Sequence, residues 1–172
     1  MFRGGISDDQ TGMTSGAWAK VELDTIHTDE DGKKYGENAD LVDGKFKPSV
    51  EGYYQVNASI GQKCSPNATK TIVGIHKNGR VDREATGVYV EADRQQNSFV
   101  STVIYLNGTI DYLELWGAVT SSGTCGIISF SNSTYLSAHL ITGQSTGGGT
   151  GGDYTPEDIV WEDKLAEREL DK

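Results

Sequence analysis

The middle of this chain, residues 17–142, consists of short runs in which apolar and polar side chains alternate. In the run 53–60, Tyr54, Val56, Ala58 and Ile60 would point to one side of a strand and the residues between them to the other. The runs are separated by the turn-forming pairs Asp31-Gly32, Asp43-Gly44, Asn78-Gly79, Asn107-Gly108 and Ser122-Gly123. No long helical pattern interrupts them, so the sequence predicts an all-β domain, an antiparallel sandwich or barrel.

The two ends of the chain follow other patterns. Residues 1–16 carry four glycines and no apolar periodicity, which predicts a flexible N-terminal arm. Residues 143–154 are rich in glycine and predict a flexible linker. Thr155 and Pro156 fit the N-cap and first turn of a helix, so residues 155–172 are expected to form a short acidic amphipathic helix.

This C-terminal helix has two interpretations. It can remain a disordered acidic tail, or it can fold on a partner or a sister subunit, because a short helix on a flexible tether is marginal in water by itself. The side chains that would make the contact are Ile159, Trp161, Leu165 and Leu170.

The charge balance excludes several classes of function. There are 15 basic and 25 acidic residues, a net charge of −10, which argues against a nucleic-acid partner. No apolar stretch approaches the roughly 20 residues that a membrane helix needs. The phosphate-binding, nucleophile-elbow and zinc-protease motifs are missing, and the three histidines are far apart. We therefore expect no enzyme, no catalytic residues, no cofactor and no membrane association.

Two smaller features of the sequence each allow two interpretations. The acidic turn around Asp29 and Asp31 is similar to a calcium loop but lacks the distal glutamate, so a solvated loop is the alternative. Cys64 and Cys125 fit no metal or redox spacing. Because the start of the chain has no apolar signal-peptide core, free buried thiols are expected, with one disulfide as the alternative.

Four segments, in order, resemble the globular head of the C1q/TNF-like family. They are Gly44–Val56 (GKFKPSVEGYYQV), Ile75–Gly79 (IHKNG), Tyr105–Asp111 (YLNGTID) and Tyr135–Ile141 (YLSAHLI). The resemblance covers residues 17–142 and implies a two-sheet antiparallel jelly roll that assembles as a homotrimer. It implies a role in the subunit core or the trimer interface, which the sequence does not separate, for Tyr54, Val56, Tyr105, Tyr112, Leu115 and Leu140.

The function implied is structural. With an arm, a tethered tail and no collagen-like stalk, the chain is similar to viral and bacteriophage proteins that carry this head. The leading hypothesis is a virion decoration, cement or head-fibre trimer, made in the host cytoplasm and anchored by one or both ends to the major capsid protein or another virion protein. One alternative is a tail-fibre knob that binds a receptor or glycan through its loops, with Trp18 and Trp116 as possible sugar-stacking residues. The other is a secreted C1q-like ligand.

Overall fold

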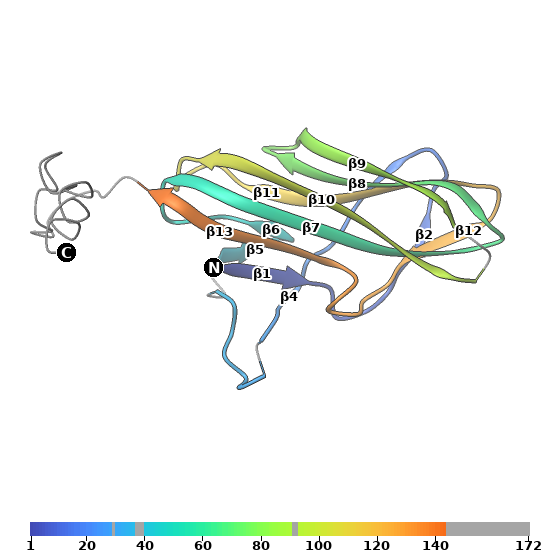
Figure 1. The fold of residues 1–172 in the computed structure, drawn as a ribbon, viewed down its shortest axis with the longest axis horizontal. Coiled ribbons are helices and arrows are strands. Elements are labelled where there is room, and N and C mark those ends of the chain that lie inside the picture. The colour runs from blue at the N-terminus through green and yellow to red at the C-terminus, as the bar shows by residue number, and fades with distance from the viewer. Residues whose placement is uncertain (29, 37–39, 91–92, 144–172) are drawn as a thin grey trace, which may run out of the picture.

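The computed structural model describes residues 1–28, 30–36, 40–90 and 93–143 (Figure 1). Within these residues the chain forms thirteen β-strands in two antiparallel sheets, and no α-helix. No helix in this part of the chain is long and apolar enough to cross a membrane. The prediction of a two-sheet antiparallel sandwich is confirmed.

The larger sheet is built around one long central strand, β7 (Gly52–Ser65). One edge of β7 is paired with β10 (Gln95–Leu106). The other edge is shared by β13 (Tyr135–Gly143) and β12 (Thr124–Ile127), which pair with different halves of β7. Beyond them lie β1 (Phe2–Gly5) and β4 (Thr25–Ile26) on one side, and β2 (Gln10–Met13) on the other.

The smaller sheet is centred on β11 (Leu113–Ser121) and β8 (Ala68–Lys77). Strand β9 (Arg80–Val90) forms its outer edge beside β8. The far edge of β11 is paired with two short strands, β3 (Trp18–Lys20) and β6 (Lys45–Phe46), and β5 (Leu41–Val42) lies beyond β6.

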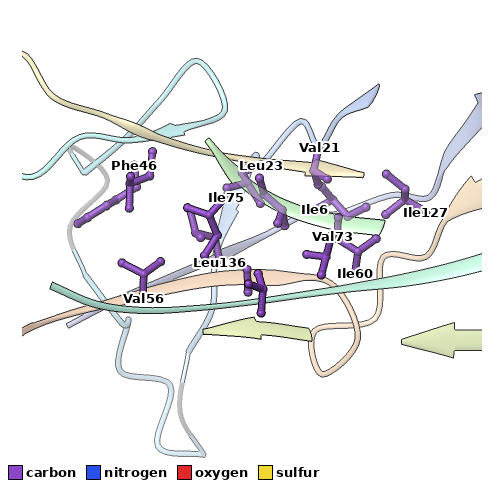
Figure 2. Packing of buried hydrophobic residues seen from close by; sticks show 14 of the residues in the cluster. Ile6, Val21, Leu23, Phe46, Val56, Ile60, Val73, Ile75, Ile127 and Leu136 are labelled. Atoms are coloured by element: carbon purple, nitrogen blue, oxygen red, sulfur yellow. The ribbon is translucent and has the colours of Figure 1, made fainter. Parts of the chain in front are cut away.

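The core lies between the two sheets, where alternate residues of facing strands meet (Figure 2). The alternation expected in β7 is confirmed, since Tyr54, Val56, Ala58 and Ile60 are all buried. Val73 and Ile75 of β8 face them from the other layer (Figure 2). Burial of such side chains contributes about 1.5–3 kcal/mol each, so this interior dominates the stability of the sandwich.

Two of the predicted turn pairs have the backbone that a two-residue hairpin needs. Asn78 and Gly79 join β8 to β9 with φ angles of 52° and 78°. Asp43 and Gly44 join β5 to β6 with φ angles of 52° and 67°. Positive φ at both central positions matches the twist of the flanking strands, and asparagine, aspartate and glycine tolerate it best.

The expectation of a flexible arm over residues 1–16 is wrong for the segments that form β1 and β2. Strand β1 lies between β13 and β4, with Phe2 opposite Ala138. Phe2 and Ile6 are 2% and 3% exposed, inside the core. The two apolar residues are separated by Gly4 and Gly5, so no alternation is visible in the sequence. At the other end Gly143 belongs to β13, not to a linker.

The expectation of free thiols is also wrong, and the alternative, one disulfide, is confirmed. Cys64 of β7 and Cys125 of β12 are directly opposite each other and form a disulfide, with their Cα atoms 4.1 Å apart. The two residues are separated by 61 positions, so only the pairing of β7 with β12 reveals their proximity.

Candidate interaction surfaces

The structure separates the core and interface candidates that the sequence could not. Tyr54, Val56 and Leu115 are buried in the subunit's own core. Leu140 is partly buried against that core. Tyr112 is half-buried under the Lys45 ammonium, which lies 4.5 Å from its ring centroid. Of the six candidates, only Tyr105 is well exposed, at 40%.

Tyr105 belongs to a group of exposed apolar residues on the outer face of the larger sheet. We call the group Tyr53, Val103, Tyr105 and Ile141 the apolar patch; each member is between 40% and 53% exposed. Tyr105 lies opposite Tyr53 in the register of β10 and β7, and their ring centroids are 5.4 Å apart in an edge-to-face arrangement. Ile141 lies in the irregular stretch of β13 beside Tyr53.

The Tyr105 side chain is held in place by its neighbours. Its hydroxyl donates a hydrogen bond to Oε1 of Glu51 over 2.6 Å, and the Lys77 ammonium donates to its backbone carbonyl over 2.7 Å. The hydrogen bond to Glu51, with smaller contributions from desolvation and nearby charge, raises the pKa of Tyr105. The phenol therefore stays a neutral donor, and the ring is presented to solvent in one orientation.

A polar strip lies beside the apolar patch on the same face. The Gln55 amide donates to the Ser101 hydroxyl over 2.8 Å, and that hydroxyl donates to Oδ1 of Asn57 over 2.8 Å. Because these groups satisfy one another across β7 and β10, the strip can be covered by another surface without leaving them unpaired.

Sequence reasoning missed three members of the patch, Tyr53, Val103 and Ile141. A signal was present, because the run 99–106 (FVSTVIYL) is apolar on both faces of a strand. Strands that are apolar on both faces are typical of sheets covered on both sides. In the structure Val100, Ile104 and Leu106 fill the inner face of β10, so only the outer face lacks a cover.

The two tryptophans proposed for sugar stacking pack around a histidine on the outer face of the smaller sheet. The His76 ring stacks on Trp116 with centroids 4.8 Å apart, and its edge meets Trp18 at 5.3 Å. The Trp18 indole lies against Gly74, so close that a Cβ at position 74 would come within 2.9 Å of it. Both tryptophans are half-buried, so part of each ring face is taken by this packing.

Several predicted site residues lie outside the described part of the chain. Asp29 is one of them, so the calcium prediction stays untested; Asp31 is described and exposed. No cluster of three or more potential metal ligands occurs among the described residues. The docking candidates Ile159, Trp161, Leu165 and Leu170 also lie outside them.

Comparison with known proteins identifies the fold. No family model and no curated protein matches the sequence. The chain is similar to murine APRIL, with a TM-score of 0.50 and 10% identity over 78% of this chain and 93% of that one. A structure of Eiger TNF from S. frugiperda has a TM-score of 0.45 and 13% identity over 87% and 99%. The chain therefore has a TNF-like jelly-roll fold.

Proposed function

We propose that this chain is a non-enzymatic head module that associates as a homotrimer and serves as a decoration, cement or head-fibre protein on a virion. The observation that carries the proposal is the apolar patch on the outer face of the larger sheet. The trimeric state is inferred from the resemblance to C1q/TNF-like heads, and the patch supplies a surface through which subunits could make contact.

The occupant that fits the patch is a second copy of the chain. Tyrosine suits a contact between copies because its ring buries area while its hydroxyl keeps a polar partner. The four side chains of the patch are uncharged, and the charged groups beside Tyr105, Glu51 and Lys77, have opposite signs, although the chain as a whole carries a net charge of −10. Two copies of so acidic a chain repel each other through their charged surfaces. Association is therefore favoured at a surface where apolar area is buried and like charges do not face each other.

The placement of the chain ends supports display on a particle. Phe2 is paired with Ala138, and β13 continues from there to Gly143, so both ends of the described chain leave from the same end of the sandwich (Figure 1). Because β1 and β2 are part of the sheet, they are not available as a free anchor. The proposed anchor is therefore the segment 144–172, present three times in a trimer, which multiplies weak attachments.

The oligomeric state tests the proposal directly. Sedimentation velocity of the full chain should give a trimer, and Val103→Asp should give a monomer because a carboxylate at the interface would be desolvated. Val81→Asp is the matched control: Val81 is 48% exposed on β9, against 52% for Val103, and lies on the other sheet. A monomeric wild type, or a Val103→Asp variant that remains trimeric, would contradict the proposal.

The anchor has its own test. Deleting residues 144–172 should leave the trimer intact in sedimentation and abolish binding to the particle that carries the protein. If the truncated trimer still saturates the particle, the tail is not the anchor, while the oligomeric part of the proposal stands.

One observation favours the alternative of a receptor- or glycan-binding head that works outside cells. The Cys64–Cys125 disulfide is of the kind that persists in oxidising surroundings and is rare in the cytosol. A glycan array probed with the purified trimer distinguishes the two functions: selective binding supports the recognition head, and binding to the particle alone supports the decoration protein.

A further inference from the structure

A polar hollow lies at the edge of the larger sheet, away from the apolar patch. It has a volume of about 420 Å³ and is open to solvent. Its walls come from β1, from β4 and the residues after it, and from the segment before β13; they are Arg3, Thr25, Ile26, His27, Thr28, Ser131 and Asn132. On the outer face this hollow occupies the corner near the start of β13, whereas the patch occupies the corner near its end.

The composition of the walls favours a negatively charged ligand. Among the described residues they contain one guanidinium, one imidazole, three hydroxyl groups and one amide, and no carboxylate. Arg3 makes no ion pair with any described residue, although the chain has an excess of acidic side chains. An arginine that faces hydroxyl and amide groups without a carboxylate partner is the arrangement that recognises oxyanions.

Arg3 is fixed in position by contacts that leave part of its guanidinium unused. Its Nη2 donates to the Ser131 carbonyl over 3.0 Å, and the guanidinium carbon lies 4.3 Å from the centroid of the Tyr135 ring. Nε of Arg3 is buried and has no hydrogen-bond partner in the described part of the chain. A buried donor left unpaired is unfavourable, so a further acceptor beside the guanidinium would stabilise it.

His27, which directly follows β4, places an imidazole beside the Arg3 guanidinium. Its backbone N–H donates to the Arg3 carbonyl over 3.0 Å, which keeps the two residues side by side. The imidazole lies against Gly5, where any Cβ would overlap the ring. Nδ1 of His27 is also buried, with no hydrogen-bond partner among the residues that the structure describes.

The charge state of His27 links the site to pH. Burial, and then the positive charge of Arg3, lower the pKa of His27, which favours the neutral form of the imidazole. Among the described residues, the charged group that faces the ring is Arg3 from β1, which lies over the Tyr135 ring of β13. Lys34 is paired with Thr28 across the adjoining hairpin. An anion between Arg3 and His27 would offset the arginine charge and raise the pKa of His27.

We infer that this hollow binds an oxyanion group, such as the carboxylate of an acidic sugar or a free phosphate or sulfate ion. Arg3 supplies the permanent charge, and His27 and the hydroxyl groups of Thr25, Thr28 and Ser131 supply further donors. The site is independent of trimer formation, so it holds whether the protein decorates a particle or binds a receptor.

The test is calorimetric titration of the full chain with sodium sulfate, sodium phosphate and N-acetylneuraminic acid, at constant ionic strength. Saturable binding of an oxyanion supports the site, and the rank order of the three shows whether a sugar acid or an inorganic ion is its ligand. Arg3→Gln should weaken binding about 10- to 100-fold, the effect of losing a charge-assisted hydrogen bond. Arg80→Gln removes an exposed arginine at the β8–β9 turn and should leave the affinity unchanged.

A second measurement does not depend on how well the Arg3 variant folds. In the wild-type protein, the imidazole resonances of His27 should titrate at a higher pH when the oxyanion is present, while those of His76, on the other sheet, do not move. Absence of saturable binding by all three anions, equal loss of affinity in the Arg3 and Arg80 variants, or an unshifted His27 titration in the presence of a bound anion would each overturn the inference.

Discussion

Phe2 stacks on Phe46, with ring centroids 4.5 Å apart and planes inclined by 27°. Phe2 comes from β1 of the larger sheet and Phe46 from β6 of the smaller one, so the contact closes the space between the two layers. Tyr54 also contacts Phe46, in an edge-to-face arrangement with ring centroids 5.8 Å apart. The first strand of the chain is therefore part of the hydrophobic core.

Phe2→Ala tests this contact. Loss of a fully buried phenylalanine should lower the free energy of unfolding by about 3 kcal/mol, since it leaves a cavity against Phe46. Met1, 65% exposed, offers the control substitution Met1→Ala, which should have little effect. Denaturant unfolding measures both. Equal stability of the two variants would mean that β1 does not dock on the sandwich.

Reduction of the Cys64–Cys125 disulfide should destabilise the protein. Closing a loop between residues separated by 61 positions limits the unfolded chain and contributes about 4 kcal/mol in the chain-entropy model. The midpoint of unfolding should fall in dithiothreitol, and the Cys64→Ala/Cys125→Ala variant should not respond to the reductant. Thiol titration of the unreduced, unfolded chain should find no free cysteine; two free thiols would contradict the pairing.

Asp111 joins the 107–111 loop to the β8–β9 turn and to the end of β8. Its carboxylate accepts a hydrogen bond from the Asn78 amide over 2.7 Å and lies 3.0 Å from the Lys77 ammonium. Asp111→Ala should lower the free energy of unfolding by about 2 kcal/mol, because those groups lose their partner. Glu22→Gln is the control, since the Glu22 side chain is 63% exposed and its ion pair with Lys20 should contribute less than about 1 kcal/mol.

The same carboxylate should contribute to acid denaturation. Burial alone would raise the pKa of Asp111, but the hydrogen bonds from Asn78, Lys77 and the Asn107 backbone, with the Lys77 charge, outweigh it and lower the pKa below 3.8. The stabilisation by Asp111 is complete when the pH is above the pKa of this carboxyl in the unfolded chain. It is lost as the pH falls through the pKa in the folded protein. Urea unfolding at a series of acidic pH values should show a smaller loss of stability in Asp111→Ala than in the wild type.

His76 should make the protein less stable in mild acid. Burial lowers the pKa of His76 below its usual 6.5, and Glu114 and Glu84 oppose this only in part. Below pH 6.5 the unfolded chain therefore binds a proton that the folded chain resists, so stability falls as the pH decreases toward the folded pKa. His76→Phe keeps a ring between Trp18 and Trp116 and should flatten this part of the pH profile of the melting temperature. The lowered pKa of His27 affects stability in the same direction, so part of the pH dependence should remain in the His76→Phe variant.

The sequence predicted the fold wherever alternation was regular. The run 53–60 and the Asn-Gly and Asp-Gly pairs are local signals, and the structure confirms them as β7 and two hairpins. Strand β1 was missed because Gly4 and Gly5 interrupt its pattern, and its place in the sheet depends on pairing with a strand at the other end of the chain.

The surfaces were less predictable for a physical reason. Alternation assigns Tyr53 and Tyr54 to opposite faces of β7, but it does not say which face the second sheet covers. Tyr54 was therefore as good an interface candidate as Tyr105 until the layers were known. The hollow around Arg3 and His27 was equally hidden, since three separate segments of the chain form its walls.

The antiparallel pairing of β1 with β13 constrains how the protein is made. Phe2 cannot meet Ala138 until nearly all of the described chain has left the ribosome, so the larger sheet keeps an open edge throughout synthesis. Contacts between such distant residues also form slowly, because closing a long loop costs entropy before the pairing repays it. The pairing of β1 with β13 is therefore a late step in the folding of this sandwich.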